Sequence, residues 1–297
     1  MKSFDIATLT LNPAIDQTVV IPGFTPGAVN RVERFHHLAG GKGINVAAAL
    51  EGVRVAATGF LGSANSSFFE TFFAEKNIAD AFVRINGETR TGIKITDPVS
   101  QQTTDINFPG ISPTVQDLET LWERCESLTA PWFALGGSLP PGVPADFYRE
   151  LILALHKREI QAVLDTSGEP LRLGLEAAPA IVKPNLHELE TLLGKPLKSL
   201  PDILQAARGL IARGVRLAVV SMGSAGACFV TEHEAVIARP PEISVGSTVG
   251  AGDAMVAGIL CAQVRGLSLE ECARMATAFS LRRLTGDGSA QISISYE

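Results

Sequence analysis

The sequence has few of the features that mark a secreted, membrane-bound or metal-binding protein. Its N-terminal apolar run, residues 6–11, is short and ends at Asn12-Pro13, so it predicts a strand and not a signal peptide. No run approaches the length of a transmembrane helix. None of the four cysteines belongs to a C-x-x-C pair, which argues against a zinc site or a disulfide framework: Cys125, Cys228, Cys261 and Cys272. We expect a cytoplasmic protein with reduced, buried cysteines.

Positive charge is also scarce. The chain has 25 Lys and Arg against 31 Asp and Glu, a net charge of −6 and a pI near 5.5. Such a chain offers no basic field to nucleic acid or to an anionic membrane, and we expect neither as a partner. An anionic ligand would have to be held by locally placed cations. Candidates gather in the first third of the chain: Arg31, Arg34, Lys42, Arg90 and Lys94.

Two common nucleotide-binding motifs are missing. The two Gly-Lys pairs are followed by Gly43 and Pro196, so neither completes the P-loop pattern G-x-x-x-x-G-K-[ST]. No G-x-G-x-x-G follows the first predicted strand. These absences disfavour a P-loop enzyme and an ordinary dinucleotide-binding dehydrogenase.

Apolar periodicity predicts an α/β fold. The chain has 297 residues, 46% of them hydrophobic, which is ample for a buried core. From about residue 112, strand-like runs alternate with helical periodicity, which predicts a mainly parallel sheet with helices on both faces. The predicted helices are 42–50, 66–76, 114–128, 145–156, 186–193, 200–213, 253–265 and 269–284, and the predicted strands are 5–11, 55–61, 132–135, 161–165, 180–183, 217–221, 227–231 and 235–238.

Two segments interrupt this pattern. Residues 16–22 with 30–38, and 89–96 with 102–108, alternate apolar and polar side chains as strands with one exposed face do. We predict that they form a small β lid, residues 12–38 and 89–108, on an α/β core made of 1–11, 39–88 and 109–297. Because such a lid leaves sheet edges that need cover, we also expect a homodimer in which the lids pair.

The most informative stretch is residues 247–255, where two glycines lead into an acidic residue at a predicted helix start. Gly250 and Gly252 allow a tight turn whose free N–H groups, including that of Ala251, can point at an anion. A carboxylate would repel a bound phosphate, so Asp253 is better suited to accept a proton from an incoming hydroxyl group. The plainer alternative is an ordinary aspartate in the first turn of a helix.

Other polar clusters follow predicted strands. Gly41, Lys42 and Asn45 open an alanine-rich helix, where backbone amides, a cation and a carboxamide would meet a polar ligand, although a glycine loop can also serve close helix packing. Asp16 follows the first strand, where an open parallel sheet binds its ligands, and it could grip sugar hydroxyl groups or be an unremarkable turn residue.

A further cluster begins a helix at Lys183. Asn185 and Glu188 have the spacing of a capping box, and they could equally organise water around a Mg²⁺ ion bound to nucleotide phosphates. Position 191 is threonine, so no zinc motif is present. The small-residue turn from Ser221 to Gly226 could approach a nucleotide.

Five motifs occur together and in order: N-P-A-I-D at 12–16, G-G-K-G-I-N at 40–45, G-S-L-P-P-G at 137–142, K-P-N-x-x-E at 183–188 and T-V-G-A-G-D at 248–253. Over nearly the whole chain this set resembles the ribokinase-like (pfkB) carbohydrate kinases. Within that family the chain is most similar to the 1-phosphofructokinases and tagatose-6-phosphate kinases, through residues 27–31, 88–90, 104–107 and 165–168. Asp105, Ile111 and Met222 depart from the usual Glu, Pro and Leu.

The resemblance implies the following roles. ATP is the co-substrate and Mg²⁺ the cofactor, held through water by Asn185 and Glu188. The catalytic residues are Asp253 as base and Gly250, Ala251 and Gly252 as the anion hole. The sugar-phosphate site comprises Asp16, Gly41, Lys42, Asn45, Arg90, Lys94, Asn107 and Ser138, with Arg90 on the substrate phosphate. The nucleotide site comprises Lys183, Asn185, Ser221, Gly223, Ser224, Gly226, Thr248 and Gly252.

These roles predict transfer of the ATP γ-phosphoryl group to the free primary hydroxyl of a ketohexose phosphate. The first expectation is conversion of fructose 1-phosphate to fructose 1,6-bisphosphate. Tagatose 6-phosphate and fructose 6-phosphate remain alternative acceptors, because each also has a phosphate at one end and a primary hydroxyl at the other. A sugar-phosphate sensor without activity is the alternative from another class, and Asp253 with its anion turn argues against it. A phosphate-binding oxidoreductase ranks last, because the sequence shows no nicotinamide or flavin fingerprint.

Overall fold

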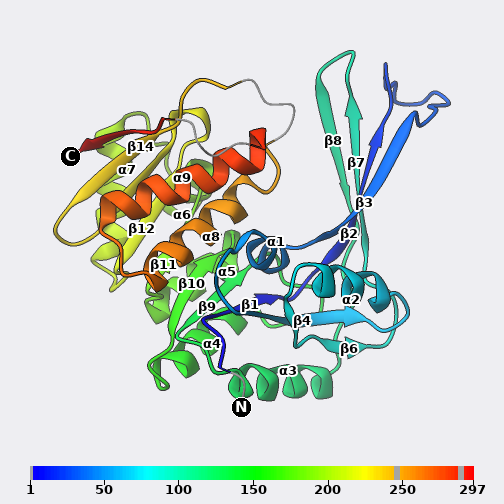
Figure 1. Ribbon diagram of the computed structural model, residues 1–297, viewed down its shortest axis with the longest axis horizontal. Coiled ribbons are helices and arrows are strands. Elements are labelled where there is room, and N and C mark those ends of the chain that lie inside the picture. Colours follow the sequence, from blue (N-terminus) through cyan, green and yellow to red (C-terminus); the bar gives the residue numbers. More distant parts are fainter. Residues whose placement is uncertain (1–2, 244–247, 287–290) are drawn as a thin grey trace.

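The residues that the structure describes form two β-sheets of very different size (Figure 1). A computed structural model describes residues 3–243, 248–286 and 291–297. The strands of the large sheet are, in spatial order, β15 (Ser293–Tyr296), β14 (Ala235–Arg239), β13 (Ala227–Val230), β12 (Leu217–Ser221), β11 (Ile181–Val182), β10 (Gln161–Asp165), β9 (Trp132–Gly136), β1 (Ile6–Thr10), β4 (Val55–Gly62) and β5 (Ala79–Asp80), with β6 (Val83–Ile85) also paired to β4. From β12 to β5 every pair is parallel, and β12 to β15 pair antiparallel.

Helices cover both faces of the large sheet, as the sequence predicted. One face packs against α1 (Lys42–Ala49), α2 (Ser66–Glu75), α8 (Ala251–Val264) and α9 (Leu269–Thr285). The other packs against α3 (Val115–Ser127), α4 (Phe147–His156), α5 (Gly168–Gly174), α6 (Leu186–Leu193) and α7 (Leu200–Ile211). Because both faces are covered, β1, β4 and β9 are buried along their whole length, as is usual for parallel strands. The central sheet is therefore a rigid platform for its loops.

The small sheet projects from one end of the large one (Figure 1). Its spatial order is β3 (Arg34–Gly40), β2 (Ala14–Val20), β7 (Thr91–Asp97) and β8 (Gln102–Asn107). The two predicted segments thus meet in one sheet, and its middle pair, β2 and β7, is parallel. Val19, Ile21 and Ile95 give this sheet a small apolar cluster of its own. Its division from the core at the predicted boundaries stays a prediction.

Most predicted elements are found within two or three residues of their expected ends. The helix expected at 253–265 begins earlier, at Ala251, because Gly250 serves as its N-cap in a left-handed conformation. Not predicted were β5, β6, β15, α5 and the 3₁₀ turns Leu175–Ala177 and Gly223–Ala225. The four cysteines are buried and free, as expected. Over the described ranges, no helix is long and apolar enough to cross a membrane.

The parallel topology brings the ends of several strands to one edge. Strands β1, β9, β10, β11 and β12 are parallel neighbours, so their carboxyl ends face the same side of the sheet. Ligands of open α/β sheets bind at this edge. The loops after these strands, together with the base of the small sheet and the start of α8, surround two adjoining cavities.

Candidate active site

Two cavities meet at the carboxyl edge of the large sheet. The smaller, of about 320 Å³, lies at the base of the small sheet, and the larger, of about 810 Å³, lies beside α8 and α9. Lys42 and Asp253 line both cavities. Side chains at this junction can therefore reach a ligand in either cavity.

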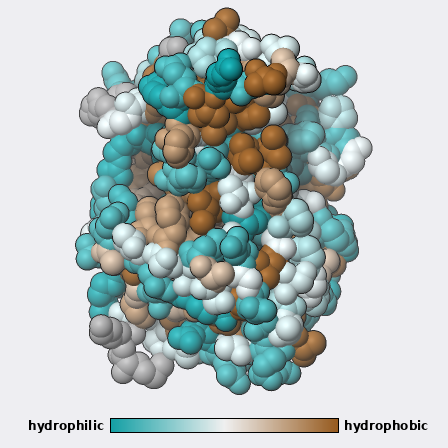
Figure 2. Space-filling view, turned by 90° about the vertical axis from the view of Figure 1, so that its right-hand side faces the viewer, coloured by the Kyte–Doolittle hydropathy of each residue, from teal (hydrophilic) through white to brown (hydrophobic). Residues whose placement is uncertain are grey.

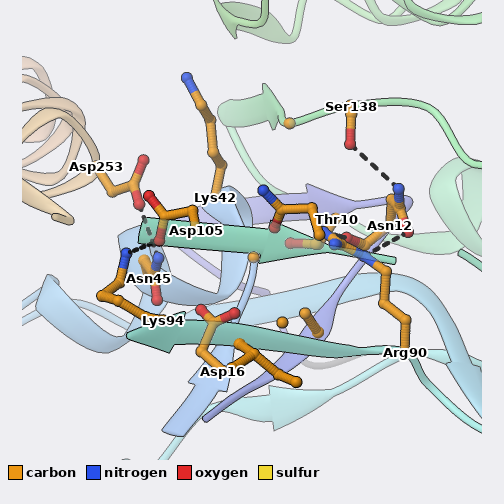
Figure 3. A pocket seen from close by; sticks show the side chains of 16 residues that line it. Thr10, Asn12, Asp16, Lys42, Asn45, Arg90, Lys94, Asp105, Ser138 and Asp253 are labelled. Atoms are coloured by element: carbon orange, nitrogen blue, oxygen red, sulfur yellow. Dashed lines mark hydrogen bonds and ion pairs between the residues drawn. The ribbon is translucent and has the colours of Figure 1, made fainter. Parts of the chain in front are cut away.

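The smaller cavity collects every residue that the sequence suggested for a sugar phosphate (Figure 3). These residues come from β2, the start of α1, β7, β8 and the loops before β7 and after β9: Asp16, Gly41, Lys42, Asn45, Arg90, Lys94, Asn107 and Ser138. Asp253 joins them from α8. Residues from both ends of the chain thus share one polar cavity, on the order of one small sugar in size.

Asp16 lies in the floor of this cavity because two glycines make room for it. On β2 it stands between Leu38 of β3 and Gly92 of β7. A Cβ atom at Gly92 would lie 2.8 Å from Asp16 Oδ1, and one at Gly40 would overlap Oδ2. Burial raises the pKa of Asp16, and the charges of Arg90 and Lys94 oppose that rise. Asp16 is thus a partly buried carboxylate flanked by cations.

Arg90 is held at the far end of the cavity by the loop that follows β1. Its Nε donates to Asn12 Oδ1 at 3.0 Å, and its two Nη groups donate to the carbonyl oxygens of Asn12 and Phe108, each at 3.3 Å. Asn12 also donates to Ser138 Oγ at 3.2 Å. Burial lowers the pKa of Arg90, but an arginine remains charged. The guanidinium group is therefore a fixed positive charge.

Lys94 adds a second cation to the small-sheet wall. Its Nζ contacts Asp105 Oδ1 at 2.5 Å across the β7–β8 pair, where the two residues lie opposite each other (Figure 3). Asp105, half exposed, is one of the three residues that depart from the family pattern, an aspartate in place of the usual glutamate. The shorter aspartate still reaches the lysine.

Asp253 lies in the first turn of α8 and is 8% exposed. Its Oδ2 accepts a hydrogen bond of 2.8 Å from Asn45 Nδ2, so α1 and α8 are joined at the junction of the cavities (Figure 3). Burial and the charge of Asp165 raise the pKa of Asp253, while Asn45, Lys42 and Lys183 act against the rise. A carboxyl group in these surroundings is a better proton acceptor than one in water.

The turn before Asp253 has the geometry of an anion site. Gly250 has φ of +80°, a conformation that favours glycine, and it caps a helix whose first N–H groups lie at the larger cavity. Lys183 Nζ lies 3.4 Å from the place of a Cβ atom at Gly252. A cation therefore adjoins the helix start. Ser247, the first residue of the stretch singled out in the sequence, lies outside the described residues.

The larger cavity collects every residue suggested for the nucleotide. They are Lys183, Asn185, Ser221, Gly223, Ser224, Gly226, Thr248 and Gly252, with Glu188 beside them. Apolar side chains form its other wall: Pro240, Pro241, Ile243, Met255, Leu281 and Leu284. A polar end with cations and amides beside an apolar wall suits a ligand that carries both phosphates and a flat ring.

Asn185 and Glu188 form the capping box that their spacing predicts. Glu188 N donates to Asn185 Oδ1 and Asn185 N donates to Glu188 Oε2, both at 2.8 Å. The box occupies one carboxylate oxygen of Glu188. In the part of the chain that the structure describes, no group of three or more His, Cys, Asp and Glu could hold a metal ion. Any cation here would need water and phosphate oxygens as further ligands.

Several residues of the smaller cavity were not singled out as candidates from the sequence, among them Thr10, Asn12 and Gly92. Asn12 belongs to the N-P-A-I-D motif, but an asparagine before proline is also a common turn residue, so its side-chain role was hidden. Gly92 acts through the absence of a side chain beside Asp16, which only the strand register reveals.

Comparison with known proteins agrees with this geometry. Residues 9–292 match the model of the pfkB family of carbohydrate kinases. A 1-phosphofructokinase of Rhodobacter capsulatus is 50% identical over 94% of this chain and 90% of its own. One of Xanthomonas campestris pv. campestris is 45% identical over 98% and 94%. The crystal structure of phosphofructokinase-2 from Escherichia coli in complex with fructose-6-phosphate superimposes with a TM-score of 0.89, at 30% identity, over 96% of this chain and 95% of that one.

The chain belongs to the pfkB family of carbohydrate kinases. It is therefore an enzyme that transfers a phosphoryl group, and as a kinase it takes that group from ATP. Its relatives named above are sugar-phosphate kinases, with 1-phosphofructokinases among the most similar sequences.

Proposed function

We propose that this enzyme transfers the γ-phosphoryl group of ATP to the free primary hydroxyl of fructose 1-phosphate, giving fructose 1,6-bisphosphate and ADP. The observation that carries the proposal is the junction of a sugar-sized polar cavity with a larger, partly apolar one at Lys42 and Asp253. The 1-phosphofructokinase names of the relatives support the choice of acceptor.

Asp253 is the general base. The hydroxyl oxygen of the sugar attacks the γ-phosphorus, the bond from that phosphorus to the β-phosphate oxygen breaks, and the hydroxyl proton passes to a carboxylate oxygen of Asp253. Its hydrogen bond to Asn45 fixes the direction of the carboxylate. The amides of Gly250, Ala251 and Gly252 stabilise the charge on the transferred group, because a helix start attracts anions.

The far end of the sugar cavity receives the phosphate already on the acceptor. Arg90 offers the guanidinium group, with Lys94 and Lys42 as further cations. Asp16 accepts hydrogen bonds from the sugar hydroxyl groups, and Asn45 donates to them. An acidic protein that brings two phosphorylated substrates together needs these local charges. Asn107 and Ser138 complete the contacts from the sides, and the nucleotide lies along Lys183, Ser221, Gly223, Ser224, Gly226 and Thr248.

The residues present fit a Mg²⁺ ion that travels with ATP. Glu188 lines the nucleotide cavity, and one of its oxygens is not used by the capping box. Mg²⁺ keeps several water ligands and needs only one or two protein carboxylates, so Glu188, with Asn185 beside it, is sufficient. The ion would neutralise phosphate charge, while this chain's own residues orient the two substrates.

The small sheet also serves as a dimer interface in this proposal, with a second copy of the chain as the partner. Its outer strands, β3 and β8, are edge strands and largely exposed. Figure 2 looks at this end of the molecule and shows apolar side chains gathered on the upper half. The exposed apolar residues of these segments are Val29, Val32, Phe35, Leu38, Ile106 and Phe108. Exposed apolar edges of this kind favour pairing with a second copy. Because Phe35→Ser removes an apolar side chain from this edge, it should shift the molecular mass measured in solution towards that of a monomer.

A coupled assay with ATP tests the proposal. Fructose 1-phosphate, fructose 6-phosphate, tagatose 6-phosphate and free fructose are compared by kcat/KM. We expect fructose 1-phosphate to give the highest value. A higher value for either of the other sugar phosphates would move the assignment to that acceptor. If none of the four sugars is turned over, a sugar-phosphate sensor without activity becomes the better assignment. We also propose that the enzyme acts in the cytoplasm, a reducing compartment in which its four cysteines would stay free.

A further inference from the structure

A buried aspartate lies beneath the junction of the two cavities and has no part in the roles given so far. Asp165 is the last residue of β10, a central strand of the large sheet, and its side chain is 4% exposed. It does not line either cavity. It cannot touch a substrate, so any effect on the reaction must pass through its neighbours.

Those neighbours are two lysines from different parts of the chain. Lys42 Nζ contacts Asp165 Oδ1 at 2.9 Å, and Lys183 Nζ contacts the same oxygen at 3.3 Å. Lys42 lines both cavities and is 33% exposed, whereas Lys183 lines the nucleotide cavity and is 4% exposed. One carboxylate oxygen thus holds two ammonium groups side by side, although they repel each other.

This arrangement is a poor device for stability alone. The other oxygen, Asp165 Oδ2, is buried and has no hydrogen-bond partner within the described ranges. Buried charge clusters stabilise a fold only when every oxygen is satisfied, and two cations on one carboxylate leave positive charge unbalanced. Asp253 is the other carboxylate whose charge acts on both lysines, and it lies at the junction itself. Departures from good packing of this kind cluster at functional sites.

We propose that Asp165 is a positioning residue for phosphoryl transfer, which fixes the ammonium groups of Lys42 and Lys183 at the junction so that they meet the phosphoryl group as it crosses. The inference rests on the proposed function, since it assumes transfer across this junction. Lys183 lies beside Gly252 of the anion turn, and Lys42 lines both cavities. Held by one atom, the two cations keep a fixed separation while the ligands change.

The first test is Asp165→Asn, which keeps the shape and removes the charge. We expect kcat to fall about 100-fold, the loss expected when a catalytic group is displaced by about 1 Å. KM for either substrate should change much less, because the substrates are bound mainly by other residues. Asp165→Ser, which leaves space for water beside the lysines, is measured alongside in case the asparagine variant does not fold.

A double-mutant cycle separates positioning from a structural role. If Asp165 acts through Lys42, its replacement should cost several-fold less in kcat when Lys42 is already methionine. The matched control is Asp80→Asn, which changes an aspartate that accepts hydrogen bonds from Phe82 N and Arg84 Nη1 and lines neither cavity. It should lower the urea midpoint of unfolding and leave kcat within about threefold.

Three results overturn the inference: a folded Asp165 variant with near-native kcat, an equal loss with and without Lys42, or a loss matched by the Asp80 control. All need a native enzyme that turns over one of the four acceptors. If the native enzyme is inactive on all of them, the proposed function fails before any variant is measured.

Discussion

Arg90→Lys measures how much of the binding of the acceptor depends on the guanidinium group. In the structure Arg90 already uses Nε and both Nη groups to hold the loop after β1 and the end of β8. Arginine has five N–H donors, so it can keep these contacts and still offer two to a phosphate. Lysine has three donors on one atom, and that atom cannot reach Asn12 and the phosphate together in the same way.

The expected loss is one charge-assisted hydrogen bond, about 1.5–3 kcal/mol. Since about 1.4 kcal/mol corresponds to a tenfold change, KM for fructose 1-phosphate should rise by roughly 10-fold to 100-fold. KM for ATP should change little, because Arg90 lines only the smaller cavity. Steady-state kinetics with each substrate varied in turn measures both constants.

Arg84→Lys is the matched control. Arg84 of β6 pairs with Glu70 and Asp80 and lines neither cavity, so its replacement should leave both KM values unchanged. An unchanged KM for the acceptor in Arg90→Lys, or equal turnover of free fructose and fructose 1-phosphate by the native enzyme, would refute the reasoning. A kinase for an unphosphorylated sugar would then be the better assignment.

Four further predictions concern the base, its hydrogen-bond partner, the metal and the small sheet. Asp253→Asn should fold and bind nucleotide while kcat falls by roughly 10²–10⁴. Asn45→Ala should move the acid limb of the kcat/KM profile to higher pH, because the lost hydrogen bond had lowered the pKa of Asp253. Glu188→Gln can still cap α6, so unfolding should change little while activity falls and more Mg²⁺ is needed. Hydrogen exchange in 14–40 and 91–107 should slow when fructose 1-phosphate binds, since closure must exclude water.

Each of these has an outcome that contradicts it. Near-native kcat in Asp253→Asn would reduce that residue to a helix-start aspartate, and an acid limb that moves to lower pH in Asn45→Ala would reverse the electrostatic argument. Equal losses of stability and activity in Glu188→Gln, with no change in Mg²⁺ requirement, would leave the capping box as its only role. Exchange that is the same with and without ligand would remove the small sheet as a lid.

The sequence predicted those parts of the fold that carry a strong local signal. The helix at 186–193 has a capping asparagine at one end and Gly194 at the other, and its bounds agree with the structure. Strands β5 and β6 have two and three residues, which is too short for any periodicity, so only pairing with β4 defines them. Helix α5 contains Gly168 and a proline near its start, which weakens a helical pattern.

The residues of the candidate site could be predicted where they belong to a sequence motif. They could not be predicted where their role depends on strand register or on burial in the fold. The glycine turn, Lys42 and Asn45 follow from local patterns. Asp165 was visible only as part of a family segment, because nothing near it in the chain tells that Lys42 and Lys183 meet on its oxygen. Contacts between residues more than a hundred positions apart come from the topology of the sheet.

The chain enters and leaves the small sheet through segments that also line the sugar cavity. Asn12 precedes β2, Gly41 follows β3, Arg90 precedes β7 and Asn107 ends β8. The pivots of any movement of this sheet are thus the same residues that would grip the acceptor. A sugar phosphate that fits would stiffen all four pivots together, whereas a smaller sugar that leaves Arg90 untouched would leave one loose. Selection of the acceptor and closure over it would then be a single event, with no separate signal passing between them.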